Sequence, residues 1–297
     1  PVLLIVFNRP EPTRQVLDAI RRVRPSRLYI SGDGPRSERP DDRARVEQVR
    51  ALVAEVDWPC QVETRFLDRN VGCKEGPAGA ITWFFDHESE GIILEDDVLP
   101  SDKAFAYWQW GLETFRDQQD VFLIPAMSFF ATGGSRPRRS RLVPCWGWAS
   151  WRRAWIHYDP MMTSWSRKNH LVSRAHFGKA AEYVYRTYDR YDPVNDDAWD
   201  IPWSWSVLAQ GGVSILPPFP LIDNLGFGPD ATHTRGHNRH GVASELYGHR
   251  QLAHVVPEPT IDVALDEQYL IKQYGADRLM RRFKSFVRKF VKPTPVR

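Results

Sequence analysis

Three adjacent carboxylates, Glu95, Asp96 and Asp97, are the strongest chemical signal in the chain, because they directly follow an apolar run at 91–94. Like charges this close repel one another, so a cation or solvent must offset them. Carboxylate oxygens suit hard divalent ions such as Mg²⁺ or Mn²⁺, which proteins commonly hold together with substrate phosphates. The alternative is a solvated acidic turn, or acids favoured by the N-terminus of the next helix. Their place after a buried strand favours the metal site.

Polar residues also follow the three earlier strand-like segments. In open parallel sheets, ligands bind at the carboxyl ends of the strands, so we expect these residues to share one edge with the acids. Arg9 and Lys74 could bind a diphosphate or be ordinary surface charges. Asp33 could accept a hydrogen bond from a nucleobase or simply shape its turn. The candidates at this edge are Asn8, Arg9, Asp33, Asn70 and Lys74.

The elements that must position these residues are predicted from hydrophobic periodicity. Strand-like and helix-like patterns alternate along the first 125 residues, which predicts an α/β fold with a mostly parallel sheet flanked by helices. The strand-like segments are 2–7, 27–31, 62–67 and 91–95, and a late one lies at 211–216. The helix-like segments begin at 12, 41, 77 and 101, while 132–141 is predicted to be a mobile basic loop.

Tryptophans distinguish the second half, because ten of the 12 lie between Trp108 and Trp205. Indole faces can stack on sugars, but large aromatic side chains also fill cores, and for any single tryptophan the core is favoured. A carboxylate among them could act as a general base. Asp196, Asp197 and Asp200 are all candidates by sequence, and Asp200 is preferred because tryptophans stand on both sides of it.

Several motifs together resemble the GT-A type nucleotide-diphosphosugar glycosyltransferases, and they are especially similar to N-acetylglucosaminyltransferase I and its bacterial relatives. The likeness extends from Leu3 to about Thr234, and the acidic triad with its flanks is its most specific part. The motifs are SGDGPR at 31–36, NVG at 70–72, GIILEDDVLPSDKAF at 91–105, WGW at 146–148, WDIPW at 199–203 and GFGPDATHT at 226–234.

The resemblance implies a role for each matching position. Asp97 would bind the metal, Mn²⁺ or Mg²⁺, that bridges the donor diphosphate, with Glu95 and Asp96 near the ribose and the metal-bound water. Asp33 would face the nucleobase, and Arg9 the uracil or the phosphates.

The remaining implied roles concern the metal, the base and the acceptor. His233 would be a second metal ligand, although GFGPDATHT matches the family pattern only loosely, and Asp200 would be the general base. Asn8 stands where the animal enzyme has an acid. Asn70 and Lys74 complete the nucleotide-sugar-binding set, and the acceptor-binding tryptophans would be Trp146, Trp148, Trp199 and Trp203.

Together these features predict an inverting, metal-dependent glycosyltransferase. Residues 1–125 would bind the nucleotide diphosphosugar, with a UDP-sugar favoured, and 126–255 would bind a glycan or lipid-linked acceptor and supply the base. Residues 256–297 would form a helical basic tail. The alternatives are a carbohydrate-binding protein without transfer activity and a sugar-nucleotide pyrophosphorylase, although the latter would want a glycine-rich loop where NRPEPT stands at 8–13.

Charge is distributed unevenly along the chain. The 40 Lys and Arg residues against 37 Asp and Glu give +3, but seven basic residues lie between Arg278 and Lys292, so the rest is mildly acidic. That stretch is amphipathic, and binding to an anionic membrane surface and packing on the body both remain open. Three scattered cysteines fit a reducing compartment. We therefore expect a cytoplasmic protein, peripheral at the inner membrane face if the tail binds lipid, and no nucleic-acid partner.

Overall fold

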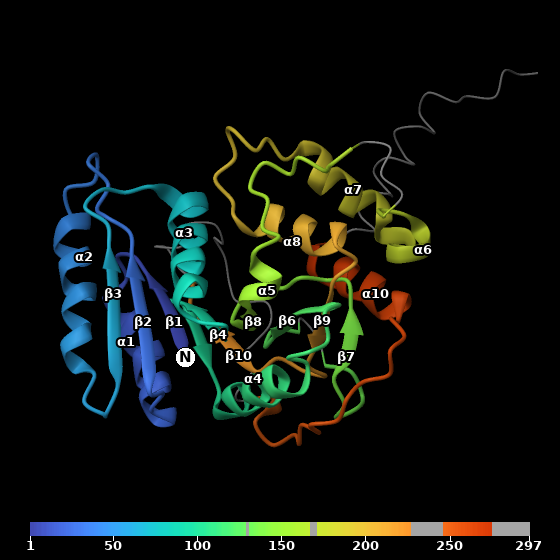
Figure 1. Cartoon of the computed structure of the whole chain (residues 1–297), viewed down its shortest axis with the longest axis horizontal. Helices are drawn as coiled ribbons and strands as arrows, with labels where there is room; N and C mark the ends of the chain where they lie inside the picture. Colours follow the sequence, from blue (N-terminus) through green and yellow to red (C-terminus); the bar gives the residue numbers. More distant parts are fainter. Residues whose placement is uncertain (129–130, 167–170, 227–245, 275–297) are drawn as a thin grey trace, which may run out of the picture.

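The computed structural model describes residues 1–128, 131–166, 171–226 and 246–274. An eight-stranded sheet runs through them in the order β3-β2-β1-β4-β8-β6-β9-β7 (Figure 1). Its strands are β1 (Val2–Val6), β2 (Arg27–Gly32), β3 (Gln61–Phe66), β4 (Glu90–Glu95), β6 (Val121–Pro125), β7 (Arg138–Ser140), β8 (Trp148–Trp151) and β9 (Val213–Leu216). A separate two-stranded ribbon pairs β5 (Val98–Pro100) with β10 (Ile222–Asn224).

The direction of the strands confirms the predicted fold class. Strands β1 to β4 pair only in parallel with one another, and β6 is parallel to β9. Strand β8 runs antiparallel between β4 and β6, and β7 is antiparallel to β9. The segment predicted to be a mobile basic loop is therefore partly ordered, because Arg138–Ser140 forms the edge strand β7. The chain has a mixed α/β fold with a mostly parallel sheet.

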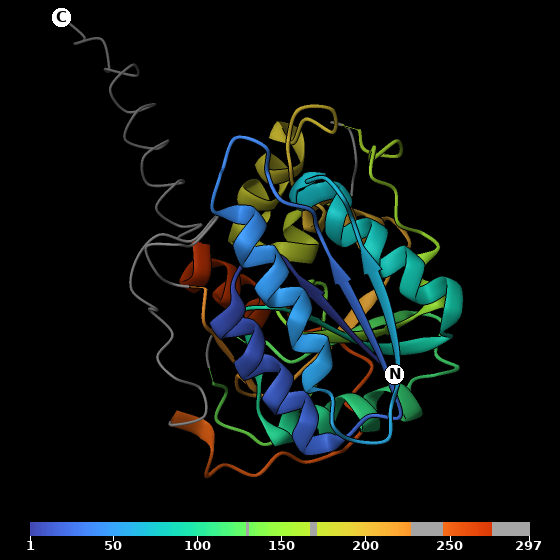
Figure 2. The ribbon, with the colours of Figure 1, turned by 90° about the vertical axis from the view of Figure 1, so that its left-hand side faces the viewer.

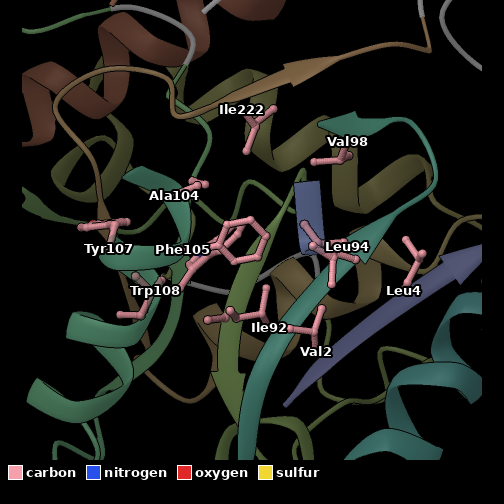
Figure 3. Close-up of a cluster of buried hydrophobic side chains, with 14 of the residues drawn as sticks. Val2, Leu4, Ile92, Leu94, Val98, Ala104, Phe105, Tyr107, Trp108 and Ile222 are labelled. Atoms are coloured by element: carbon pink, nitrogen blue, oxygen red, sulfur yellow. The ribbon is translucent and has the colours of Figure 1, made fainter. Parts of the chain in front are cut away.

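Helices cover both faces of the sheet because alternate strand residues point to opposite sides. Val2 and Leu4 of β1 belong to a core shared with α1 and α4, whereas Leu3 belongs to a second core shared with α3 and α8. Figure 2 shows α1 and α2 on one side of the first strands, and Figure 3 shows the first core. The helices are α1 (Pro10–Val23), α2 (Asp42–Ala51), η1 (Leu52–Glu55), α3 (Gly72–His87), α4 (Asp102–Thr114), α5 (Arg152–Trp155), α6 (Arg174–Phe177), η2 (Gly178–Ala180), α7 (Ala181–Arg190), α8 (Asp200–Ala209) and α10 (Val263–Tyr274).

A third core joins α6, α7, α8 and α10 beside the sheet. Helix α10 is anchored there by Asp266, whose side chain is fully buried. Its carboxylate accepts hydrogen bonds from Arg138 Nη1 at 2.5 Å, Ser140 Oγ at 2.7 Å and the backbone N–H of Arg141 at 3.0 Å. The end of the described chain is thus tied to β7 and the loop that follows it. No described helix is long and apolar enough to cross a membrane, and the basic stretch at 278–292 lies outside the described residues.

Asp266→Ala is expected to lower the free energy of unfolding by about 3–5 kcal/mol, because it leaves a largely buried guanidinium and two other donors without an acceptor. Chemical denaturation measures the change. Gln268→Ala, an exposed position of the same helix, is the matched control and should stay within about 0.5 kcal/mol of the parent chain. Equal stability of the two variants would show that the Asp266 cluster does not hold α10 in place.

Candidate active site

A cavity of about 460 Å³, here called the first cavity, lies where β4 ends and the second half of the chain approaches it. Polar side chains from both halves line it together with aromatic ones. They include Arg9, Glu95 and Asp97 from the first half, and Trp146, Trp199 and Asp200 from the second. The structure thus brings together the predicted phosphate-binding, metal-binding and base residues, which are separated by up to 191 positions in the sequence.

The acidic triad is held at the end of β4 by the first loop of the sheet. Asp96 is buried, and its carboxylate accepts a hydrogen bond from the backbone N–H of Phe7 at 3.1 Å. Arg9 reaches both neighbouring acids, with Nη2 at 3.5 Å from Asp96 and Nη1 at 2.7 Å from Asp97. Strands β1 and β4 are paired in parallel, so their carboxyl ends lie side by side and the contact follows from the topology.

Three carboxyl groups, those of the acidic triad, meet one guanidinium, that of Arg9, at this point. Burial raises the pKa of Glu95 above its ordinary range, and the carboxylates of Asp97 and Asp96 raise it further. Burial likewise raises the pKa of Asp96, although Arg9 opposes the shift. Both shifts have the same physical meaning: removing these carboxylates from water, with one guanidinium among them, disfavours their charged forms. An additional cation would relieve this.

The described side chains fit a metal that takes most of its ligands from a substrate. Among them, no group of three or more His, Cys, Asp or Glu side chains is arranged to hold an ion. Mg²⁺ typically needs only one or two carboxylates together with phosphate oxygens and water. Asp97 and Glu95 both line the cavity and could supply them. His233, the other predicted ligand, lies outside the described residues.

Asp33 and Asn70 organise the N-terminus of α3 rather than line the first cavity. The Asp33 carboxylate accepts hydrogen bonds from the backbone N–H groups of Gly34, Val71 and Gly72, at 2.7–3.1 Å. The side-chain amide of Asn70 donates to the same carboxylate at 2.9 Å. These bonds satisfy the donors that a helix start leaves open. The turn-forming interpretation of Asp33, left open by the sequence, accounts for its contacts.

Asn8 and Lys74 also bind other parts of the protein. The side-chain amide of Asn8 donates to Asp42 at 2.7 Å. The ammonium of Lys74 donates to the carbonyl oxygen of Pro193 and lies 5.8 Å from the ring centre of Tyr191. Neither residue lines the first cavity. Their contacts fix the loops around the cavity, and Arg9 is the predicted basic residue that reaches into it.

The three aspartates considered for the general base have different surroundings. Asp196 is exposed and accepts a hydrogen bond from the backbone N–H of Asp192 at 2.9 Å. Asp197 is likewise exposed and also lines the first cavity, and its carboxylate accepts bonds from the N–H groups of Cys73 at 3.0 Å and Lys74 at 2.6 Å, so it caps α3. Asp200 is the first residue of α8 and lines the first cavity. Asp200 therefore stays the predicted base, and Asp197, which shares the cavity, stays the alternative.

The four predicted acceptor tryptophans divide into two pairs. Trp146 and Trp199 line the first cavity. Trp148 and Trp203 are 0% exposed, so the structure corrects the prediction for these two: they are core residues and cannot contact an acceptor. Trp148 stacks on Trp199 with ring centres 6.1 Å apart and contacts Trp203 at 5.8 Å. The buried Trp148 and Trp203 therefore support the indole of Trp199, which lines the first cavity.

Among the residues of this wall that the sequence did not indicate are Asn224 and Tyr274. Asn224 ends β10, a strand that was not predicted from the sequence. The neighbouring Gly226 approaches Asp97 so closely that an added Cβ would lie 2.2 Å from Oδ2 of Asp97. Tyr274 is the last described residue of α10, a helix whose docking beside the cavity no local pattern indicates.

No protein-family model matches the chain, and no curated protein matches it either. Among solved structures, HddC from Yersinia pseudotuberculosis is similar with a TM-score of 0.30 and 10% identity, over 51% of this chain and 77% of that one. The apo form of mouse xyloside xylosyltransferase 1 is similar with a TM-score of 0.35 and 12% identity, over 70% of this chain and 81% of that one. Neither is an N-acetylglucosaminyltransferase I. Both likenesses are distant, and the functional proposal depends on the side chains of the cavity.

Proposed function

We propose that the chain is a glycosyltransferase that moves a sugar from a nucleotide diphosphosugar to a glycan or lipid-linked acceptor with inversion. The observation that carries this proposal is that Asp97 with Arg9 and Asp200 with Trp199 line one cavity. Such a reaction needs positive charge beside the leaving diphosphate and a base beside the attacking hydroxyl. The two pairs offer these functions from opposite halves of the chain.

Arg9 is the residue that would stabilise the leaving group. Its guanidinium already bridges Asp96 and Asp97, so its orientation is set before a ligand arrives. A planar guanidinium suits phosphate oxygens because it donates two parallel hydrogen bonds. A divalent ion held by Asp97, with Glu95 close by, would neutralise charge that develops on the departing diphosphate. Metal dependence is thus part of the proposal.

Asp200 would take the proton of the acceptor hydroxyl. In a single displacement the acceptor oxygen bonds to the anomeric carbon, the bond from this carbon to the diphosphate oxygen breaks, and the proton passes to the carboxylate. Trp199 precedes Asp200 and is itself backed by the buried Trp148, so the base begins its helix beside a rigid aromatic wall. A fixed position matters because proton transfer requires hydrogen-bond contact with the hydroxyl.

Thermal unfolding in the presence of ligands tests the proposal. The midpoint is expected to rise with UDP and UDP-sugars, and to rise further when Mn²⁺ is added, because a ligand that binds only the folded state stabilises it. Mn²⁺ alone is the control for binding that does not involve a nucleotide. A chain that responds to free sugars but to no nucleoside diphosphate, with or without Mn²⁺, is a carbohydrate-binding protein and not a transferase.

A further inference from the structure

A second cavity of about 270 Å³ adjoins the first. The two cavities share four lining residues, Val143, Pro144, Asp200 and Tyr274. Arg9, Glu95 and Asp97 line only the first. Asp200 therefore stands between a space that Arg9, Glu95 and Asp97 line and a space that they do not.

Aromatic and aliphatic side chains form most of the wall of the second cavity. Tyr183 of α7 stacks on Tyr274 of α10, with ring centres 5.4 Å apart and planes inclined by 18°. Tyr188, one turn further along α7, donates a hydrogen bond to Ser204 Oγ at 3.2 Å. Phe177 and Leu270 belong to the apolar part of the wall. Flat aromatic faces beside hydroxyl groups suit a sugar ring, which has apolar C–H surfaces and polar edges.

Arg141 is the cationic side chain of this cavity, and the described residues leave its guanidinium without a partner. Its backbone N–H binds Asp266, but no hydrogen bond or ion pair is formed by its side chain within the described part of the chain. The nearby Arg138 forms an ion pair with the Asp266 carboxylate at 2.5 Å. Burial lowers the pKa of Arg141, against the opposing effect of Asp266. A half-buried cation with free donors is costly unless an anion joins it.

We propose that the second cavity binds the acceptor sugar and that Arg141 recognises an oxyanion on it, either a carboxylate or a phosphate. The proposal rests on the proposed transferase function, since it assigns the acceptor side of that same site. The acceptor hydroxyl would approach Asp200 from the second cavity. The anomeric carbon of the donor would approach this hydroxyl from the first cavity. This separates the attacking oxygen from the leaving diphosphate, as an in-line displacement requires.

Titration of the intact chain with three sugars tests the inference. Methyl β-glucuronide carries a carboxylate, glucose 1-phosphate carries a phosphate, and methyl β-glucoside is neutral. We expect at least one anionic sugar to bind about tenfold or more tightly than the neutral one, because hydrogen bonds to a charged group exceed neutral ones by that order. The sugar that binds more tightly shows whether the recognised oxyanion is a carboxylate or a phosphate. Calorimetry measures all three dissociation constants.

Arg141→Gln should reduce the affinity for the anionic sugar to that for the neutral one. Arg141→Lys should retain part of the preference, because it keeps the charge but loses the bidentate geometry. Arg136→Gln is the matched control, since Arg136 is exposed and lines neither cavity. Thermal unfolding of each variant verifies its fold, and Arg141→Lys keeps the test decisive if Arg141→Gln does not fold.

The outcomes separate this inference from the proposed function. Three results would overturn the role of Arg141: all three sugars bind equally, none of them binds, or the preference for an anionic sugar survives in Arg141→Gln. A parallel titration with UDP-sugar and Mn²⁺ tests the donor side. If donor binding is present but the anionic preference is missing, the inference fails and the transferase proposal stands. If the preference is present but no nucleotide binds, the anionic-sugar site stands and the transferase proposal fails.

Discussion

Sugar transfer by Asp200→Asn is expected to fall about 10²–10⁴-fold, the range associated with a general base, while donor affinity stays unchanged. The amide has nearly the same shape as the carboxylate but cannot accept the proton of the acceptor hydroxyl. Asp200 lines the first cavity without being part of the Arg9 and Asp97 contact that we assign to the diphosphate. Initial rates measured with saturating donor, together with a donor titration, separate the two effects.

The neighbouring aspartates provide the controls for this variant. Asp196→Asn should retain wild-type turnover, because Asp196 is exposed and does not line the first cavity. Asp197→Asn should act through stability, by about 0.5–2 kcal/mol, because its carboxylate caps α3 through two backbone amides. Normal turnover in Asp200→Asn combined with a collapse in Asp197→Asn would transfer the role of the base to Asp197.

The first half of the fold could be predicted because its signals are local. Strands β1 and β4 are short apolar runs, and the periodicity of α1 and α2 is set by residues three and four apart. Parallel topology then places the ends of β1 and β4 at one edge, which is why Arg9 and Asp97 could be expected to meet. A sequence pattern combined with one topological rule was sufficient to predict this contact.

The second half resisted prediction because its arrangement depends on contacts between distant segments. Strand β8 inserts antiparallel between β4 and β6, and no local pattern specifies that insertion. The same applies to the tryptophans. Trp199 and Trp203 are four positions apart at the start of α8, yet one lines the cavity and the other is fully buried. The residue type alone does not tell whether a tryptophan lines a cavity or fills the core.

Polar residues at strand ends illustrate a different limit. Asp33 and Asp97 both follow parallel strands, and both are carboxylates at the predicted edge. Asp33 is surrounded by backbone N–H groups of the α3 N-terminus, whereas Asp97 faces Arg9 and the first cavity. The difference arises from where the next helix begins. The sequence predicted that start at Pro77, and the structure places it at Gly72, which brings the amides to Asp33.

Arg9 and a divalent ion would compete for the carboxylate of Asp97. An experiment can therefore show whether Asp97 binds a metal or only holds Arg9. If the ion is required, Asp97 must release part of its contact with Nη1 of Arg9, now 2.7 Å, when the donor binds. If Arg9 alone neutralises the diphosphate, donor binding should not depend on metal. A donor titration with and without Mn²⁺, in the parent chain and in Arg9→Gln, separates these contributions.

Asp97→Ala is expected to weaken Mn²⁺-dependent donor binding by about 100-fold or more, since loss of even an outer partner of a metal ligand typically costs 10–100-fold. The backbone should persist, because the hydrogen bond from Leu225 N–H to the carbonyl oxygen of Asp97 does not involve the side chain. Asp117→Ala, an exposed loop aspartate, is the control and should bind donor normally. Unchanged donor affinity of Asp97→Ala in Mn²⁺ would defeat the metal assignment. Arg9 would then remain as the group that holds the diphosphate, and donor binding would not depend on metal.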